Sequence, residues 1–581
     1  MKRLPSPAPF LVLLAPAVLP QSGGTGLADA LAAPDSALRA AIERYATDRR
    51  TLLRYHDVPL SESRRERMAR FYGGWREELE GLDYGALDRE SRIDYLLLAD
   101  RLDYELRRLE RERREAGEMA PLLPFAPGLV ALEEARTRME PIDPPALAQT
   151  LDSLREAVEA SREALEERLD GADEDAPVAA KTVAERAARR LDQLRSTLRG
   201  WHRHYDGYDP LYTWWAAEPY EALDRELGDF ADFLREELVG VDADDEDAIV
   251  GDPIGRAALL SELQRERIAY TPEELVERAE AEFAWCEAEM QRAARELGFA
   301  GDWRAALEHV KGLHVAPGEQ PRLVRELALE AIDYLDEREL VTIPPLCREV
   351  WRLEMMSPAS QKVTPFFTGG EVIRVAFPTD GMTHEQKRMS LRSNNEHFSR
   401  ATVHHELIPG HHLQGYMAAR HRTHRRIFST PFYGEGWALY WELLLWDLGF
   451  QRSAEDRVGM LFWRMHRCAR IVASLGFHLE QMEPPEMIDY LVDRVGHERS
   501  AATAEVRRWV GGSYGPLYQC AYLIGGLQFR ALRAELVETG RMSDREFHDA
   551  VLRQNSIPVE LVRASLRGEL LPRDAAPAWR F

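Results

Sequence analysis

The chain has 581 residues, of which 45% are hydrophobic and 30% charged, so it can bury a large core and is expected to form two or three domains. Its 99 Asp and Glu residues outnumber its 75 Lys and Arg residues, and the net charge of -24 would repel phosphate backbones and anionic lipid surfaces. We therefore expect a globular protein that binds no nucleic acid.

The first thirty residues have the layout of a secretory signal peptide. Lys2 and Arg3 precede an apolar run over residues 10–20, and Ala28-Asp29-Ala30 offers a cleavage site. We expect residues 1–30 to direct export, which would make the mature protein periplasmic or secreted; the alternative is a disordered tail. This stretch contains no cysteine for a lipid anchor. After it, no apolar run approaches the roughly 18 residues that span a bilayer, so no membrane insertion is expected after signal removal.

Between residues 31 and 245, apolar positions recur at helical spacing between charged faces, which predicts long amphipathic helices. Two such sets are Leu151, Leu154, Val158, Leu165 and Leu169, and Leu223, Leu227, Phe230, Leu234 and Leu238. The period is interrupted over residues 242–253, where an acidic run is followed by Gly-Asp-Pro. We place a boundary there, between an N-terminal helical region at 31–245 and a catalytic region at 246–581, which together would enclose one cleft.

Local signals predict further elements in the second region. Thr271-Pro272-Glu273-Glu274 supplies an N-cap, a first-turn proline and an N3 carboxylate, so a helix is expected from there to about Leu297. Residues 363–367 and 371–377 have the pattern of two short strands joined by Gly369-Gly370, which predicts a small β-hairpin.

Only four cysteines occur, and they are widely spaced: Cys286, Cys347, Cys468 and Cys520. They form neither a Cys-x-x-Cys metal motif nor a disulfide framework. We expect four free, buried thiols.

Histidines cluster directly after the predicted hairpin. Eight of the 17 histidines fall within 41 residues, at His384, His397, His404, His405, His411, His412, His421 and His424. Imidazole is the commonest protein metal ligand, so this enrichment predicts a metal site. The last two of these histidines stand among four arginines, and there we expect a solvated basic patch instead.

The spacing within the cluster departs from the usual zinc-hydrolase helix, in which His-Glu-x-x-His places two imidazoles one turn apart. Here position 409 is proline, and the next histidines after His405 are His411 and His412. On a regular helix, residue i+6 lies about 240° around the axis and residue i+7 about 10.5 Å away, so neither could share one ion with His405. Pro409 lacks an N–H and Gly410 is conformationally free, so we expect a two-residue bulge. It would make His405 and His411 the ligands, with His412 as the alternative, and leave His404 and His412 to line or support the site.

A carboxylate from a following helix is expected as the third ligand. Glu435 lies between two glycines that allow close approach to a metal, whereas Glu442, two turns further on, is the competitor and is better suited to orient a histidine. The fourth position of a Zn2+ ion would hold water. Glu406 is then placed to act as the general base that activates this water.

The segment His405-Glu406-Leu407-Ile408-Pro409-Gly410-His411-His412, followed by Glu435-Gly436-Trp437-Ala438-Leu439-Tyr440, closely resembles a large bacterial family labelled as a domain of unknown function and grouped with the gluzincin (MA-clan) metallopeptidases. Glu435 is similar to the third-ligand glutamate in the Asn-Glu-Gly-Phe segment of zinc aminopeptidases. The resemblance implies a mainly α fold with a deep cleft and a small β-hairpin or sheet beside the zinc helix.

The resemblance extends more weakly over residues 60–570. It suggests His478 and Tyr522 as donors to the substrate or to the tetrahedral oxyanion, with a hydrogen-bonded core residue as the equal alternative for each. Ser474 and Tyr518 stand where the family usually has Asp and Gln. These departures leave the support of the site and its substrate preference open.

The sequence therefore predicts a zinc metallopeptidase that hydrolyses short peptides, with Glu406 as general base. One alternative is a catalytically inactive, peptidase-like binding protein. Another is a zinc hydrolase acting on non-peptide amides or esters, which would use the same residues. Exo- versus endopeptidase action, side-chain preference and oligomeric state are not indicated.

Overall fold

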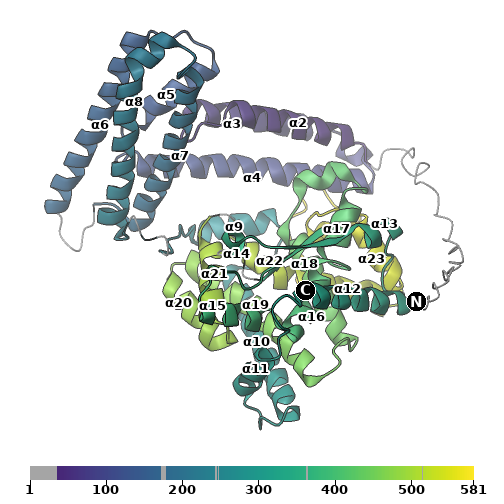
Figure 1. Ribbon diagram of the computed structural model, residues 1–581. Coiled ribbons are helices and arrows are strands. Elements are labelled where there is room, and N and C mark those ends of the chain that lie inside the picture. Colours follow the sequence, from purple (N-terminus) through teal and green to yellow (C-terminus); the bar gives the residue numbers. More distant parts are fainter. Residues whose placement is uncertain are drawn as a thin grey trace, which may run out of the picture.

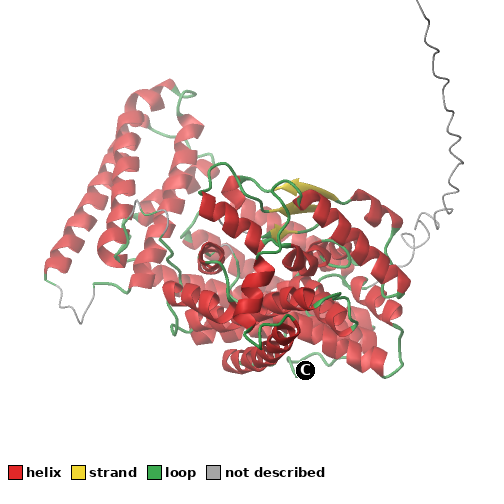
Figure 2. Ribbon diagram, turned by 60° about the horizontal axis from the view of Figure 1, so that its bottom comes forward, coloured by secondary structure: helices red, strands yellow, loops and turns green. Residues whose placement is uncertain are grey.

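The computed structural model describes residues 36–171, 178–242, 245, 248–361, 364, 366–512 and 514–581. The protein is mainly helical, as predicted, with one small sheet (Figures 1 and 2). The predicted signal peptide at residues 1–30 lies outside the described residues. Within them, every helix is too short or too polar to cross a bilayer.

Four helices form a bundle that stands beside the main body of the molecule (Figure 1). They are α5 (Ala126–Thr137), α6 (Pro144–Asp170), α7 (Lys181–Tyr205) and α8 (Pro210–Phe233), which continues as a π-helical turn over Leu234–Val239. The predicted apolar stripes face the core of this bundle: Leu151 and Val158 of α6, and Leu223 and Leu227 of α8, are fully buried. Packing of these stripes explains why such charge-rich segments fold as long helices.

The three helices that precede the bundle share a core with the C-terminal part of the chain. They are α2 (Arg39–Tyr55), α3 (Glu62–Glu80) and α4 (Arg89–Met119). Ile93 and Leu102 of α4 belong to the same buried cluster as Trp437, Trp441 and Phe529. The described residues between Val239 and Gly255 form no helix, which is where the boundary was placed; the division at 245/246 stays a prediction.

A buried ionic cluster joins α4 to residues more than 300 positions later. Asp94 accepts hydrogen bonds from His424 Nε2 at 2.8 Å and from Arg425 Nε at 2.7 Å, and Glu90 accepts from Arg425 at 2.9 Å. His424 and Arg425 are only 4% and 0% exposed. The expected solvated basic patch is therefore wrong for these residues, because α4 supplies the carboxylates that allow buried charges to be paired.

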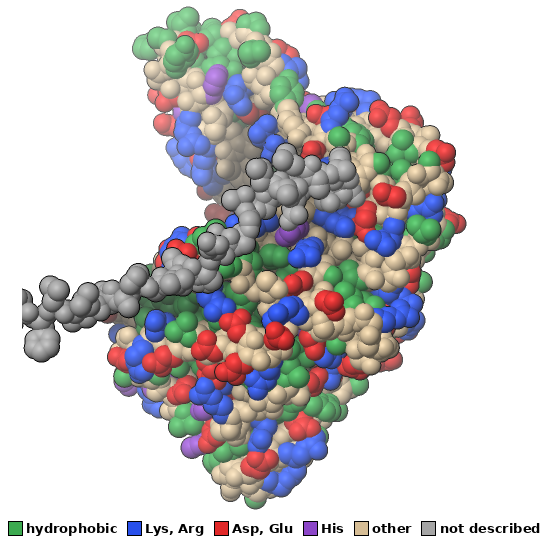
Figure 3. All heavy atoms as spheres, turned by 90° about the vertical axis from the view of Figure 1, so that its right-hand side faces the viewer, with side chains coloured by type: hydrophobic (Ala, Val, Ile, Leu, Met, Phe, Trp, Pro, Cys, Tyr) green, Lys and Arg blue, Asp and Glu red, His purple; other side chains and the backbone are tan. Residues whose placement is uncertain are grey.

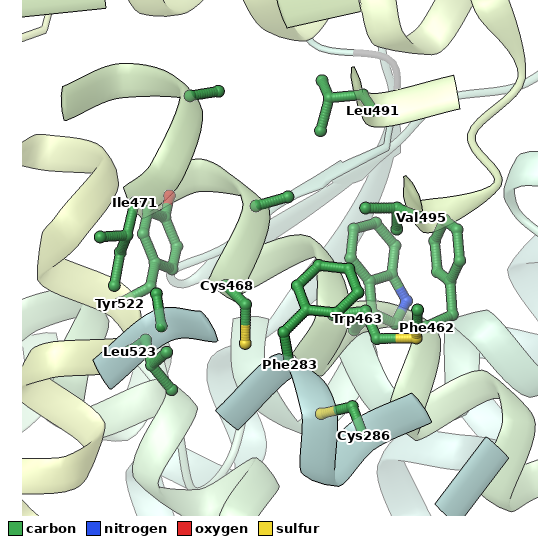
Figure 4. Packing of buried hydrophobic residues seen from close by; sticks show 14 of the residues in the cluster. Phe283, Cys286, Phe462, Trp463, Cys468, Ile471, Leu491, Val495, Tyr522 and Leu523 are labelled. Atoms are coloured by element: carbon green, nitrogen blue, oxygen red, sulfur yellow. The ribbon is translucent and has the colours of Figure 1, made fainter. Parts of the chain in front are cut away.

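The main body is built around α10 (Pro272–Glu296) and α19 (Ala454–His478). Thr271 caps α10 in a capping box with Glu274, so the predicted start of this helix is confirmed. Figure 4 shows Phe283 and Cys286 of α10 close to Phe462 and Cys468 of α19 within one apolar cluster. All four cysteines are free and buried, as expected.

Fourteen more α-helices complete the main body among the described residues. These helices are α9 (Gly255–Arg265), α11 (Trp303–Lys311), α12 (Gln320–Glu337), α13 (Pro345–Val350), α14 (Pro358–Gln361), α15 (His384–Ser393), α16 (Glu396–Glu406), α17 (His411–Ala418), α18 (Pro431–Asp447), α20 (Pro484–Tyr490), α21 (Arg499–Val510), α22 (Tyr518–Arg533), α23 (Asp544–Leu552) and α24 (Val559–Arg567). Acidic and basic side chains are interspersed over the face shown in Figure 3.

A hairpin is present where it was predicted, but its first strand is β2 (Phe367–Thr368), shifted from the predicted 363–367; it pairs antiparallel with β3 (Val372–Val375). A third strand, β1 (Arg352–Met355), lies parallel to β3, so the sheet order is β1-β3-β2. Figure 2 shows this sheet in yellow. Ile373 and Val375 pack against Val403 of α16. The sheet therefore lies directly beside α16, the helix that carries His404 and His405.

Helices α18 and α22 cross with almost no space between their backbones. A Cβ atom at Gly525 would lie 2.1 Å from the carbonyl oxygen of Phe432, and one at Gly436 would lie 2.5 Å from the Cα of Gly525. We expect Gly525→Ala to destabilise the fold by roughly 2 kcal/mol or more, because a backbone must shift to accommodate the methyl group. Gly117→Ala is the matched control, since Gly117 lies on α4 with no atom within 4 Å of an added Cβ. Chemical denaturation of both variants should separate them, and equal stabilities would contradict the close crossing.

Candidate metal centre

The helix that carries His405 ends at Glu406, and a new helix begins at His411. The four residues between them contain a cis Ile408–Pro409 peptide bond. The Gly410 N–H donates to the carbonyl of His404 at 3.0 Å, and a Cβ atom at Gly410 would lie 1.7 Å from the carbonyl oxygen of His405. The expected two-residue bulge is therefore wrong in form. The chain makes a full break, which Pro409 favours because it cannot donate to the carbonyl one turn earlier and which only glycine permits at position 410.

This break brings His411 beside His405. The two imidazole rings lie 4.9 Å apart, and their Nε2 atoms are 3.2 Å (His411) and 3.5 Å (His405) from Glu435 Oε2. One ligand atom from each of these three residues lies within 4.8 Å of the others. His412 instead places its Nε2 2.7 Å from the carbonyl of Cys347, in a buried contact. The structure thus brings together His405, His411 and Glu435, and it turns His412 away.

The two oxygen atoms of the Glu435 carboxylate have different surroundings. Its Oε1 accepts a hydrogen bond from the hydroxyl of Tyr518, whereas its Oε2 is buried and accepts no hydrogen bond from any described residue. A buried acceptor without a donor is costly, and a cation between Oε2 and the two imidazoles would satisfy it. Two histidines and one carboxylate are also a usual donor set of catalytic zinc, so these residues fit the metal that the sequence predicted.

The charges of this group support one another without a metal. Burial favours the neutral acid, yet His411 and His405 hold the pKa of Glu435 well below its ordinary value. Burial also lowers the pKa of His405, but its contacts with Glu435 and Glu442 outweigh that effect and raise this pKa to about 9. A metal ion would take the place of the proton on His405, so its binding should release protons.

Glu442 supports His405 from the other side. Its Oε1 lies 2.7 Å from His405 Nδ1 and 3.3 Å from Nη2 of Arg467. Because Nδ1 is occupied in this way, Nε2 is the nitrogen that faces Glu435 and His411. The predicted division of roles between Glu435 and Glu442 agrees with this geometry.

A cavity of about 290 Å³ opens onto these residues. Glu406, half-buried, lines it beside the turn between β2 and β3, and its carbonyl accepts a hydrogen bond from the N–H of Gly370 at 3.1 Å. Tyr522 lines it from α22, with its ring 6.3 Å from that of His405. Burial raises the pKa of Tyr522 to about 12, so its hydroxyl stays a neutral donor. Both residues can therefore reach a molecule bound at the metal position.

Two other histidines named from the sequence are not among the residues that line this cavity. His478, at the end of α19, is buried and lies near Asp252, which favours its charged form, but burial has the larger effect and lowers its pKa to about 4. His404 packs against Phe450 with ring centroids 5.7 Å apart, and neither of its ring nitrogens has a hydrogen-bond partner among the described residues. The structure thus gives His478 and His404 places in the packing around the site.

Sequence reasoning missed the arginines that line the cavity. Arg467 and Arg470 come from α19, and Arg508 comes from α21 together with Glu505. Glu505 is buried and accepts hydrogen bonds from Arg470 at 2.7 Å and from Arg508 at 2.9 Å. Arg467 and Arg508 stand 62 and 103 positions after His405, outside the two motifs that carry the site, and Arg470 belongs to a segment for which the family resemblance implied no role, so only the fold brings the three together.

Tyr518 should contribute measurably to metal affinity, because it fixes the orientation of Glu435. We expect Tyr518→Phe to weaken zinc binding by roughly 10-fold, the lower end of the range for partners of metal ligands. Tyr514→Phe is the control, since Tyr514 lines the same cavity and its ring centroid lies 4.4 Å from that of Tyr518. Competition against a chromophoric chelator measures both variants. Equal affinities would show that the hydroxyl of Tyr518 does not hold the carboxylate in place.

The chain is similar to a bacterial protein family and to two solved structures. The family model described as "Bacterial protein of unknown function (DUF885)" matches residues 37–566. Among solved structures, a "putative lipoprotein of unknown function" from Shewanella oneidensis is similar, with a TM-score of 0.65 at 17% identity over 90% of this chain and 98% of that one. A second "putative lipoprotein", from Colwellia psychrerythraea, has a TM-score of 0.57 at 16% identity over 91% of this chain and 97% of that one. No curated protein matches the chain. At these identities the two structures show a shared fold.

Proposed function

The chain belongs to the DUF885 family of bacterial proteins, and from the geometry of its site we propose that it is a zinc-dependent metallopeptidase acting on short peptides. The observation that supports this most is the group of His405, His411 and Glu435, whose buried Oε2 accepts no hydrogen bond from the described residues. Glu406 lines the same cavity. A gluzincin-like arrangement with a deep cleft is part of this proposal.

His405, His411 and Glu435 would hold the zinc ion, which when bound polarises the substrate carbonyl and makes water acidic enough to be activated near neutral pH. Three protein ligands leave room for substrate or solvent, whereas a structural zinc site is normally closed by a fourth. Glu406 would take a proton from the attacking water and pass it to the leaving amine. Tyr522, neutral at physiological pH, would donate a hydrogen bond to the oxyanion that develops on the carbonyl.

We place this activity outside the cytoplasm, in the periplasm or the medium. The support is the signal-peptide pattern of residues 1–30 and the description of both similar structures as lipoproteins. Residues 1–30 of this chain contain no cysteine, so lipid attachment there is not part of the proposal.

Zinc analysis combined with a peptidase assay tests the proposal. Elemental analysis of the purified protein should give about one zinc per chain. Hydrolysis of short peptides should stop with a chelator and return when zinc is added. A panel that includes amino-acid esters and non-peptide amides separates the peptidase from a related zinc hydrolase. Turnover that survives complete metal removal would overturn the proposal.

A further inference from the structure

Three arginines line the same cavity as the proposed metal ligands. Arg467 and Arg470 are 4% and 3% exposed, and the side chain of Arg508 is 12% exposed. Guanidinium groups are rarely buried this far unless carboxylates pair with them. The number of carboxylates around these arginines therefore shows whether their positive charges are fully paired.

The arginine wall, defined as Arg467, Arg470 and Arg508, has more positive charge than its partners neutralise. Glu442 pairs with Arg467 at 3.3 Å, and Glu505 serves both Arg470 and Arg508, so two carboxylates face three guanidinium groups. Glu442 is moreover shared with His405. Within the wall, the guanidinium groups therefore outnumber the carboxylates that pair with them by one.

Each arginine of the wall also keeps a buried nitrogen without a hydrogen-bond partner among the described residues. These nitrogens are Nε of Arg467, Nη1 of Arg470 and Nε of Arg508. Buried N–H donors normally find an acceptor, and the planar fork of arginine fits a carboxylate better than any other group in a peptide. These nitrogens are closed to solvent, so the surplus of guanidinium groups over paired carboxylates is the observation that points to an anionic ligand in the cavity.

The wall lies a short distance from the metal position. The ring of Tyr522 separates the two, with its centroid 4.2 Å from Cζ of Arg470 and 6.3 Å from the ring of His405. One extended residue spans roughly 3.5 Å. A carboxylate held by the wall would therefore lie within about three residues of a carbonyl at the metal.

We propose that the arginine wall binds a carboxylate of the substrate, so that the enzyme cleaves peptides close to a negatively charged end. The inference rests on the proposed peptidase function and specifies its substrate class. The carboxylate is either the free C-terminus of the peptide or an acidic side chain, because both present the same two oxygen atoms to the guanidinium groups.

Three blocked peptides test this with the zinc-loaded, full-length protein: N-acetyl-trialanine, its C-terminal amide, and N-acetyl-Ala-Ala-Asp amide. We expect kcat/KM for the free acid to exceed that for the trialanine amide by about 100-fold or more, because the amide leaves the guanidinium donors unpaired. Rapid hydrolysis of the Asp amide would identify any carboxylate as sufficient, and slow hydrolysis would assign the C-terminus. Equal rates for all three would overturn this inference alone. No hydrolysis of these three peptides by a preparation that cleaves an unblocked peptide would also overturn this inference alone. No hydrolysis of blocked and unblocked peptides alike would overturn the proposed function, and this inference with it.

Variants of α21 test the wall itself. In Arg508→Gln, the ratio of kcat/KM for the acid over the amide should fall about tenfold or more. Arg508→Lys keeps the charge but loses the planar guanidinium group, so its ratio should lie between those of the wild type and Arg508→Gln. Arg499→Gln is the matched control, since Arg499 is on the same helix, 64% exposed and paired with Asp489. Both substrates are compared on one preparation, so a smaller folded fraction cancels in the ratio. A ratio unchanged in both Arg508 variants would overturn the assignment.

Discussion

Glu406→Gln is expected to lower kcat/KM for peptide hydrolysis by roughly 10²- to 10⁴-fold, the usual contribution of a positioned general base. The amide of glutamine is close in shape to the carboxylate but cannot accept the proton of the attacking water. Glu406 is not one of the three proposed zinc ligands, His405, His411 and Glu435, so zinc content should stay near one ion per chain. Steady-state kinetics and elemental analysis on the same preparation measure both quantities.

The control for this variant is Glu396→Gln, at the exposed first turn of the same helix. It makes the same chemical change at the far end of α16 and should alter neither activity nor zinc content beyond about twofold, because surface substitutions seldom matter more. Full activity in a zinc-loaded Glu406→Gln protein would remove Glu406 as the base. Loss of zinc from it would instead make Glu406 a ligand.

The neighbouring histidines should behave in opposite ways when each is changed to alanine. His411→Ala is expected to lower zinc affinity by more than about 100-fold, which exceeds the effect of losing a residue that only supports a ligand. His412→Ala should keep zinc but lose stability, by roughly 1–3 kcal/mol, because it leaves the buried carbonyl of Cys347 without its donor. Chelator competition measures the first effect and chemical denaturation the second.

This pair of variants decides the register of the site independently of any activity. Each is the control of the other, since the two residues are adjacent and the substitution is the same. Loss of zinc from His412→Ala and retention of zinc by His411→Ala would show that His412, and not His411, is the ligand. The first turn of α17 would then face the metal with the other histidine.

Much of the candidate site could be predicted from the sequence because its residues lie in two short motifs. The spacing between His405 and His411 excluded a regular helix, and Pro409 with Gly410 indicated where the irregularity lies. The form of the irregularity could not be predicted. Whether a helix bulges or ends depends on what packs against it, and here the turn before β3 passes within hydrogen-bond distance of the last helical carbonyl.

The elements that remained unpredicted depend on contacts between distant parts of the chain. His424 and Arg425 look like a surface patch in sequence, and only the arrival of α4 with Asp94 makes them a buried ion cluster. Strand β1 is four residues long and only partly buried, too short for its alternation to stand out. The pairing of Arg467 and Arg470 likewise has no local signature, because these residues of α19 pair with carboxylates carried by α18 and α21.

The crossing of α18 and α22 links the stability of the fold to the geometry of the candidate metal centre. Gly436 follows Glu435 directly, and Glu442 lies on the same helix two turns later, so both carboxylates that contact His405 are carried by the one helix that has no room to move against Gly525. Engineers who seek heat-resistant variants often replace helical glycines with alanine. In this protein that strategy should spare positions 436 and 525, since a methyl group there would tilt both carboxylates together and disturb the candidate metal centre while the rest of the molecule remained folded.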